Sequence, residues 1–329
     1  MTIVSYQDTK ISIGIGESVL DALLSRGVNV PYGCRAGVCQ SCLVQAKNGV
    51  PPLAAQKGLK ETLRQQNYFL SCSCFPEQDL VIGEIDSSPL PAVVKRLRHL
   101  SPQVVEVQLT PSTRIPYYAG QFITLWCDLT GDWREGRCYS LASVPELDES
   151  LIIQVAKAPG GKVSGWIHDQ LREGQEVFFQ EPMGACFFVP ESIDQSILLA
   201  ASGAGLSPLY GILRDALHKG HAGEIHLFHR ASEMEELYLN RELLEFSANH
   251  VNFHYHPSLS ENAGSAHVPM ENIQTMIAES IDSLKNWQVY LCGSPILVNS
   301  LRKQTYLAGA SMNQIFSDAF VSKHEDPLS

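Results

Sequence analysis

The chain has no apolar stretch long enough to cross a membrane as a helix. It contains 329 residues, of which 44% are hydrophobic, yet no run approaches the roughly 18 consecutive apolar residues that a membrane helix needs. The N-terminal segment MTIVSYQDTKI also lacks the basic flank and apolar core of a secretory signal peptide. These absences predict a globular protein of the cytoplasm.

Basic charge is also scarce. The chain has 24 Lys and Arg against 35 Asp and Glu, a net charge of −11, which argues against a nucleic-acid-binding protein. There is no internal repeat and no Ser/His/Asp arrangement. The nine cysteines are an odd number without an export signal, which argues against a disulfide framework. Three of them are expected to be buried as small hydrophobic residues: Cys127, Cys138 and Cys186.

Four other cysteines have the spacing of a [2Fe–2S] cluster site. The pattern Cx4Cx2C with a distant fourth cysteine is typical of plant-type ferredoxins, and thiolate is the soft ligand that such clusters require. A zinc site is the alternative, but zinc sites usually contain two Cx2C pairs, and only one is present here. The predicted ligands are Cys34, Cys39, Cys42 and Cys72.

The fourth ligand has an alternative. Cys74 lies two residues after Cys72 and would face the same way in an extended segment. The surrounding LSC context favours Cys72.

The chain divides into three consecutive segments that differ in their patterns of strand-like and helix-like runs. Residues 1–88 combine short β-like runs with one helical pattern, and the Ser- and Pro-containing stretch at 86–92 predicts a short linker. Residues 92–190 alternate β-like runs with Gly and Pro turns, which predicts a small antiparallel barrel. In residues 191–329 apolar strands alternate with helical patterns, which predicts a parallel sheet with helices on both faces.

The second segment contains groups suited to a flat, phosphorylated cofactor. In RCYS, Arg137, Tyr139 and Ser140 offer a phosphate ligand, an aromatic ring and a hydrogen-bond donor. An isolated RxYS is more often a strand with one exposed Arg and a packed Tyr. A later segment opens a helical pattern, where backbone N–H groups and the helix dipole favour a diphosphate. It comprises Gly161, Lys162, Val163 and Ser164.

The third segment contains two turns at the ends of predicted strands. In SGAGLSP, Gly203, Gly205 and Pro208 form a strand-to-helix turn that lets a pyrophosphate approach the backbone, although it is not GxGxxG. In CGSP, Cys292 and Gly293 end a strand at the edge where open α/β sheets bind ligands. A buried structural thiol is the alternative for Cys292.

These three blocks resemble the ferredoxin-fused NAD(P)H reductases of the ferredoxin–NADP reductase superfamily. The resemblance implies a multidomain chain with a β-grasp plant-type [2Fe–2S] ferredoxin domain, an antiparallel β-barrel FAD domain and an α/β parallel-sheet NAD(P)-binding domain. It also implies electron transfer from NAD(P)H through FAD and the cluster to a partner protein, as in the reductase components of multicomponent oxygenases. CDP-6-deoxy-glucoseen reductase is similar, so a sugar-deoxygenating acceptor is an alternative. A redox carrier or sensor without nucleotide turnover is another.

Residue roles on the flavin side follow from the resemblance. It implies that Arg137 pairs with an FAD phosphate, that Tyr139 packs on the isoalloxazine ring and that Ser140 approaches the flavin N5. It further implies that Gly161 and Ser164 hold the pyrophosphate.

On the nicotinamide side, the resemblance implies that Gly203, Gly205 and Pro208 shape the nucleotide site. Cys292 is expected near the nicotinamide carbon that transfers hydride, and Phe320 of FSDAF near the flavin face.

The chain departs from the common pattern of this family. SGAGLSP replaces GGTGxAP, so that Ser202 stands for a glycine and Ala204 for a hydroxyl residue, and CGSPIL replaces CGPPxM. EPMG places Glu181 where glycine is usual. We expect these changes to alter nucleotide or flavin binding.

The choice between NADH and NADPH depends on HRASEMEELY. Arg230 and Ser232 could bind a 2′-phosphate, whereas Glu233, Glu235 and Glu236 would repel one. The sequence favours NADH.

Three histidines in HVNFHYH invite a metal-site interpretation. His254 and His256 lie two residues apart, and His250 precedes them, so two imidazoles share one strand face. With no carboxylate expected nearby, an exposed strand edge is the favoured interpretation.

Overall fold

The chain folds into two compact units, Met1–Ser87 and Ser88–Ser329, each described here by itself. The structure is a computed structural model. It describes residues 2–6, 9–28, 30, 42–83, 89–127, 135–180, 182–190, 193–260, 268 and 272–320.

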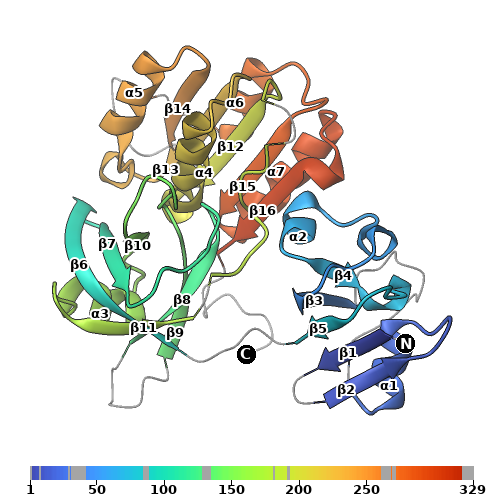
Figure 1. The fold of residues 1–329 in the computed structure, drawn as a ribbon. Coiled ribbons are helices and arrows are strands. Elements are labelled where there is room, and N and C mark those ends of the chain that lie inside the picture. Colours follow the sequence, from blue (N-terminus) through green and yellow to red (C-terminus); the bar gives the residue numbers. More distant parts are fainter. Residues whose placement is uncertain are drawn as a thin grey trace. The chain divides into compact units, whose positions relative to one another are not determined.

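The first unit contains a five-stranded mixed sheet in the order β2-β1-β5-β3-β4 (Figure 1). The central pair β1 and β5 is parallel and the other pairs are antiparallel. A small mixed sheet of this kind agrees with the β-rich domain that the sequence predicted for this segment. Its elements are β1 (Thr2–Tyr6), β2 (Thr9–Ile13), α1 (Val19–Ser25), β3 (Leu43–Asn48), η1 (Leu53–Gln56), α2 (Glu61–Gln65), β4 (Tyr68–Leu70), η2 (Ser71–Ser73) and β5 (Leu80–Ile82).

Helix α1 illustrates how sequence determines local structure in this unit. Ser18 caps its N-terminus by accepting a hydrogen bond from the backbone N–H of Asp21, a pairing that satisfies a donor the helix cannot use. Val19 and Leu23, four positions apart on one face, are fully buried. Burial of this apolar face fixes the helix against the sheet, because short helices are marginal by themselves.

The second unit begins with an antiparallel barrel of strand order β10-β7-β6-β11-β8-β9. Beyond β9, Leu141 pairs with Ile153 of β10, which closes the sheet. The predicted barrel is confirmed, but the predicted linker at 86–92 is too long because β6 already starts at Leu90. The elements are β6 (Leu90–Ser101), β7 (Val104–Pro111), β8 (Phe122–Cys127), β9 (Glu135–Ser140), β10 (Leu151–Ala156), α3 (Lys162–Asp169) and β11 (Glu176–Phe179).

The rest of the second unit is an α/β domain whose five strands are all parallel, in the order β14-β13-β12-β15-β16. Its elements are β12 (Ile197–Ser202), η3 (Gly203–Gly205), α4 (Leu206–His218), β13 (Ile225–Ala231), η4 (Met234–Glu236), α5 (Asn240–Asn249), β14 (Phe253–Leu259), α6 (Ile273–Ser280), β15 (Gln288–Gly293), α7 (Pro295–Leu307), η5 (Met312–Gln314) and β16 (Ile315–Ala319).

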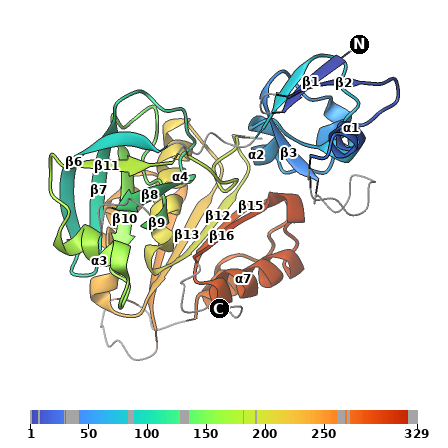
Figure 2. The same ribbon diagram turned by 90° about the horizontal axis from the view of Figure 1, so that it is seen from below.

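Helices cover both faces of this sheet, as predicted. Side chains of α4 and α5 share one apolar core with the strands and with barrel residues, and side chains of α6 and α7 share a second core with the opposite face. Figures 1 and 2 show α4 on the side of the sheet that faces the barrel and α7 on the other side. A sheet buried on both faces explains why its strands read as continuous apolar runs.

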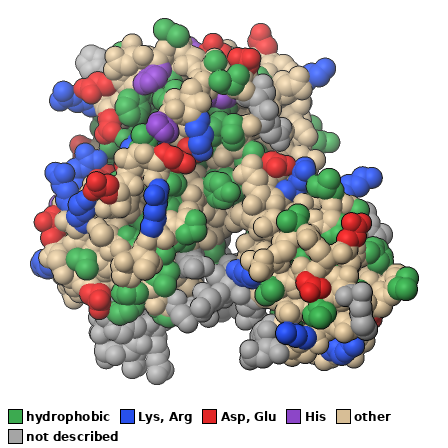
Figure 3. Space-filling model, in the orientation of Figure 1, with side chains coloured by type: hydrophobic (Ala, Val, Ile, Leu, Met, Phe, Trp, Pro, Cys, Tyr) green, Lys and Arg blue, Asp and Glu red, His purple; other side chains and the backbone are tan. Residues whose placement is uncertain are grey.

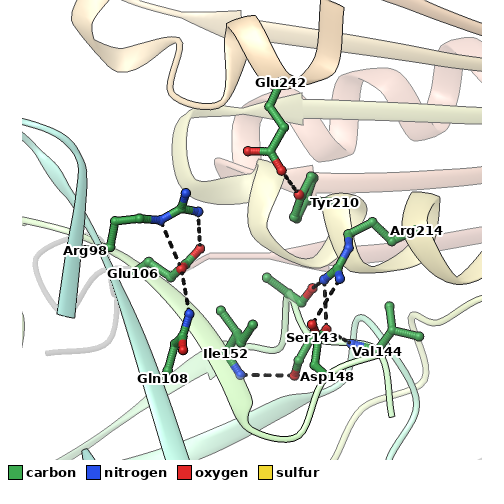
Figure 4. A network of polar contacts seen from close by, with 11 residues as sticks. Arg98, Glu106, Gln108, Ser143, Val144, Asp148, Ile152, Tyr210, Arg214 and Glu242 are labelled. Atoms are coloured by element: carbon green, nitrogen blue, oxygen red, sulfur yellow. Dashed lines mark hydrogen bonds and ion pairs between the residues drawn. The ribbon is translucent and has the colours of Figure 1, made fainter. Parts of the chain in front are cut away.

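A polar network joins the barrel to the α/β domain (Figure 4). Arg214 of α4 donates to both carboxylate oxygens of Asp148, at 2.8 and 3.0 Å. Asp148 lies in the loop between β9 and β10 and also accepts the backbone N–H of Val144. A bidentate, partly buried pair of this kind holds two elements in one orientation.

The described surface mixes charges of both signs. Figure 3 shows Lys and Arg side chains interspersed with Asp and Glu on the face in view. Within the described ranges, none of the helices combines the length and the apolar character required to span a bilayer.

The core of the first unit gives a stability prediction. Phe69 is fully buried, so Phe69→Ala should lower the free energy of unfolding of this unit by about 3–5 kcal/mol through lost burial and cavity formation. Phe75→Ala is the matched control, because that ring is 52% exposed; its effect should stay within roughly 0.5 kcal/mol. Chemical denaturation followed by circular dichroism measures both. Equal losses in the two variants would contradict the described core.

Candidate functional site

Two of the four predicted cluster ligands lie side by side in the described part of the first unit. Cys42 precedes β3, and Cys72 belongs to η2. The segments are tied together by Ser71, whose backbone N–H and hydroxyl both donate to the carbonyl of Cys42, at 3.0 and 2.9 Å. Burial raises the pKa of the Cys42 thiol, and the Cys72 side chain contributes to the shift. Cys34 and Cys39 lie outside the described residues.

Cys74, the alternative fourth ligand, has a different environment. Its side chain is fully buried in the apolar core, and burial raises the pKa of its thiol to about 12. Cys72 is only partly buried and lies next to Cys42. The thiols of Cys42 and Cys72 are therefore placed to bind the same cluster. We therefore propose Cys72 over Cys74.

The predicted flavin residues occupy strand β9 at the wall of the barrel. Arg137 is partly exposed and donates to the carbonyl of Gly136 at 2.6 Å, and Tyr139 packs against the barrel core. Ser140 is buried at the end of the strand. Because side chains alternate along a strand, Arg137 and Tyr139 share a face and Ser140 lies on the other.

The segment Gly161–Ser164 forms the first turn of α3, with Lys162 and Val163 as its first helical residues. A Cβ on Gly161 would lie 2.6 Å from the Ser164 hydroxyl oxygen, so a larger residue at this position would displace that hydroxyl. The Ser164 hydroxyl accepts the backbone N–H of Ala158 at 3.1 Å. No acidic residue lies in the first turn of the helix, so the positive end of its dipole favours an anion there. This arrangement fits the diphosphate of FAD.

Two glycines allow the turns after β12 and β15 to touch. A Cβ on Gly205 would lie 2.5 Å from the carbonyl carbon of Cys292 and 2.8 Å from the Cα of Gly293. Gly293 has φ +131° and packs directly on Ser202. The two turns therefore pack backbone against backbone, which only glycine permits at these positions.

The departure at Ser202 is explained by the same contact. Its hydroxyl oxygen accepts the backbone N–H of Ser294 at 3.1 Å. This hydrogen bond links the two turns directly. The hydroxyl occupies space beside Gly293, where a Cβ would collide with it. Serine thus adds a link between turns where the family commonly has glycine. Glu181, the other departure, lies outside the described residues.

The two parts of the second unit meet next to Cys292. Ser140 of the barrel donates a long hydrogen bond of 3.5 Å to the Asp318 carboxylate, and Asp318 pairs in register with Cys292 on neighbouring strands. The Ser207 hydroxyl of α4 donates to the Ser140 carbonyl at 3.1 Å. Burial raises the pKa of Asp318, with the Ser140 hydrogen bond opposing the shift. The predicted flavin residue and the predicted nicotinamide residue therefore share one location.

Cys292 is fully buried, and its Sγ lies 3.9 Å from that of Cys186 in the barrel. Burial raises the pKa of Cys292 well above its ordinary value, with Cys186 adding to the effect. Cys292 is therefore a neutral thiol rather than a nucleophile. Phe320 lies close by, because its backbone N–H donates to the carbonyl of Gly293 at 2.8 Å.

The remaining predicted residues lie around the same sheet edge. Pro208 is buried in the first turn of α4, where its missing N–H costs no hydrogen bond. Gly203, φ +51°, opens the turn after β12 and has open space around its Cα. Arg230 is next to last in β13 and pairs in register with Ser202.

Sequence reasoning missed several groups at this junction. Asp318 and Ser207 were not singled out, although a carboxylate inside the apolar strand FSDAF is a detectable signal. The proximity of Cys186 to Cys292 has no signal in the sequence. Cys186 is buried as expected, but Cys138 is exposed, which corrects its assignment as a buried hydrophobic residue. The side chain of Cys127 lies outside the described residues.

The glycine contact gives a prediction. Gly205→Ala should lower the free energy of unfolding of the second unit by about 1–3 kcal/mol, because the added methyl overlaps the backbone of Cys292. Gly165→Ala in α3 is the control: nothing lies within 4 Å of its Cβ, so stability should be unchanged or higher by up to about 1 kcal/mol. Denaturant unfolding measures both. A neutral Gly205→Ala would contradict the close packing.

Three family models match consecutive parts of the chain. They are a 2Fe-2S iron-sulfur cluster binding domain over residues 4–77, an oxidoreductase FAD-binding domain over 93–188 and an oxidoreductase NAD-binding domain over 199–303. Together they assign a cofactor to each predicted block. The order also agrees with the sheets described above.

Two relatives and one solved structure align with this chain along nearly the whole length of both proteins. The phenol hydroxylase P5 protein of Acinetobacter pittii is 30% identical over 333 residues, covering 95% of this chain and 92% of that protein. The CDP-6-deoxy-L-threo-D-glycero-4-hexulose-3-dehydrase reductase of Yersinia pestis is 25% identical, with 92% and 93% coverage. The crystal structure of the Amycolatopsis cytochrome P450 reductase GcoB matches with a TM-score of 0.68 at 25% identity, covering 98% of this chain and 99% of that one.

The match at 30% identity spans nearly the whole of both chains, and all three cofactor domains are present in one order. The chain belongs to the ferredoxin-fused NAD(P)H reductases of the ferredoxin–NADP reductase superfamily, which pass electrons from NAD(P)H through FAD and a [2Fe–2S] cluster to a partner protein.

Proposed function

We propose that this protein is the NADH-dependent reductase component of a multicomponent oxygenase. The junction at Ser140, Cys292 and Asp318 carries the proposal within the chain, because it brings the flavin wall to the nucleotide edge of the sheet. The acceptor is inferred from the relatives: one is named as a phenol hydroxylase protein and a solved structure as a cytochrome P450 reductase. We further propose a cytoplasmic location, where thiolates stay reduced.

When bound, FAD supplies the conversion between hydride transfer and single-electron transfer, and the [2Fe–2S] cluster supplies the single-electron exit. The chain's own task is to orient these groups. Arg137 and the first turn of α3 would bind the FAD phosphates, and Tyr139 would cover the ring. Cys34, Cys39, Cys42 and Cys72 would hold the cluster.

Ser140 has a defined hydrogen-bond direction at the flavin site. Its hydroxyl donates to Asp318, and a hydroxyl has a single hydrogen. While this hydrogen bond is made, the Ser140 oxygen can accept a further one, so it would suit an N–H group of the flavin. Burial raises the pKa of Asp318, and the Ser140 hydrogen bond opposes that shift.

The preference for NADH is argued from the turn after β13. Glu236 folds back so that its carboxylate accepts the backbone N–H of Ser232 at 2.9 Å. Ser232 is thus beside a negative charge, and Glu233 and Glu235 are exposed in the same turn. A 2′-phosphate near Arg230 and Ser232 would meet this acidic turn, whereas a ribose hydroxyl could donate to it.

The cluster assignment predicts the behaviour of cysteine variants. Cys72→Ala should lose iron and NADH-dependent cytochrome c reduction, yet keep FAD and NADH-dependent ferricyanide reduction, because the flavin path precedes the cluster. Cys74→Ala should keep iron, since Cys74 belongs to the apolar core. Exposed Cys138→Ala is the matched control.

Iron content, flavin content and the visible spectrum after anaerobic NADH addition are measured for each variant. Iron retained in Cys72→Ala and lost in Cys74→Ala would reverse the choice of ligand. Wild-type bands that bleach only with dithionite would favour the carrier or sensor alternative.

The acceptor is tested by reconstitution. The reduced protein is combined either with the terminal component of a phenol hydroxylase or with the CDP-6-deoxy-hexulose dehydrase, and product formed per NADH oxidised is measured. We expect coupled turnover with the oxygenase only, and kcat/KM at least about tenfold higher with NADH than with NADPH, equivalent to about 1.4 kcal/mol. Coupling to the dehydrase alone would instead support the alternative suggested by the Yersinia pestis relative.

A further inference from the structure

Three histidines and one glutamate gather on the edge of the parallel sheet, at the opposite end from the junction. They are Glu224, just before β13, His226 on β13, and His254 and His256 on the edge strand β14. One ligand atom each of Glu224, His226 and His254 lies within 4.8 Å of the other two. The sequence-based expectation that no carboxylate lies near these histidines is therefore wrong.

The strand register creates this cluster. His226 is paired with His254 across the two parallel strands, and Phe228 with His256. Because neighbouring strands lie about 4.8 Å apart and residues two apart share a face, all three imidazoles point the same way. The rings of His226 and His254 have centroids 4.6 Å apart, and those of His226 and His256 5.2 Å apart.

The donor atoms are linked in two pairs. Nε2 of His254 lies 2.5 Å from a carboxylate oxygen of Glu224, and Nδ1 of His226 lies 3.1 Å from Nε2 of His256. Burial lowers the pKa of His226 and of His256 to about 4, with neighbouring histidines adding to the shift. When Nδ1 of His226 donates its proton to Nε2 of His256, Nε2 of His226 keeps a lone pair that can bind a metal.

We propose that Glu224, His226 and His254 form a binding site for a borderline divalent metal ion such as Zn²⁺. Two imidazoles and a carboxylate are a donor set that zinc uses with a water molecule as the fourth ligand. A bound ion would take the place of the direct contact between Glu224 and His254. The side chains of Glu224 and His254 are 54% and 40% exposed, which gives the ion a path from solvent.

His256 has a supporting place in this site. Its ring stacks on Phe228 with centroids 4.3 Å apart and an angle of 9°, which fixes its plane. From there it contacts His226. A partner of this kind sets the tautomer and orientation of a ligating histidine.

The site would act on the sheet rather than on the redox chemistry. Glu224 and His226 belong to the start of β13, whereas Arg230 and Ser232 mark its nucleotide end. A bound ion would tie the edge strand β14 to β13, and edge strands otherwise have one unpaired side. Histidines are visible on the surface of this domain in Figure 3.

The test uses the complete holoprotein in equilibrium dialysis against micromolar Zn²⁺, with zinc and iron measured by mass spectrometry. We expect one zinc per chain and unchanged iron. Glu224→Gln and His254→Gln should each bind zinc at least about tenfold more weakly, and His256→Phe, which preserves the stacking on Phe228, about 10–100-fold more weakly.

Two controls separate this site from incidental binding. His250→Gln should retain full affinity, because His250 caps α5 through the carbonyl of Phe246 at 3.0 Å and lies outside the cluster. Mg²⁺, which prefers oxygen ligands, should not compete. No retained zinc, or zinc retained equally by Glu224→Gln and His254→Gln, would overturn the proposal.

Discussion

The second unit depends on the contact between two turns at one edge of its parallel sheet. A side chain at Gly205, after β12, would overlap the backbone of Cys292 and Gly293 at the end of β15, and a side chain at Gly293 would overlap Ser202. That approach places α4 with its N-terminus beside Cys292 and lets Ser207 reach the carbonyl of Ser140. The close packing of these two turns therefore contributes, with the Arg214–Asp148 pair, to the position of the barrel against the α/β domain.

The same contact explains how the chain tolerates an unusual residue. Ser202 replaces a common glycine, and its hydroxyl binds the N–H of Ser294 across the two turns. The serine side chain fits because Gly293, on the opposite turn, has no Cβ atom that would collide with it. The serine therefore leaves the close packing of the two turns unbroken and adds a hydrogen bond between them.

Local patterns in the sequence were sufficient for much of this structure. Apolar runs separated by helical patterns predicted the parallel sheet, and Gly and Pro turns between short strands predicted the barrel, because these signals depend only on residues near one another in the chain. The pairing of Cys186 with Cys292 could not be predicted, since it joins residues 106 positions apart. Asp318 could have been noticed as a lone carboxylate in an apolar strand, but its partner Ser140 could not.

The histidine cluster also depends on a contact between distant residues that the sequence did not reveal. His254 and His256 were recognised as sharing a strand face, and the absence of a nearby carboxylate decided against a metal site. Glu224 lies immediately before β13. It contacts His254 because the parallel register of β13 and β14 brings these two residues together. A parallel sheet aligns the starts of its strands as strictly as their ends. Within the described residues the sheet therefore has one polar cluster at each end, and the turns at its carboxyl end are placed to receive a nucleotide.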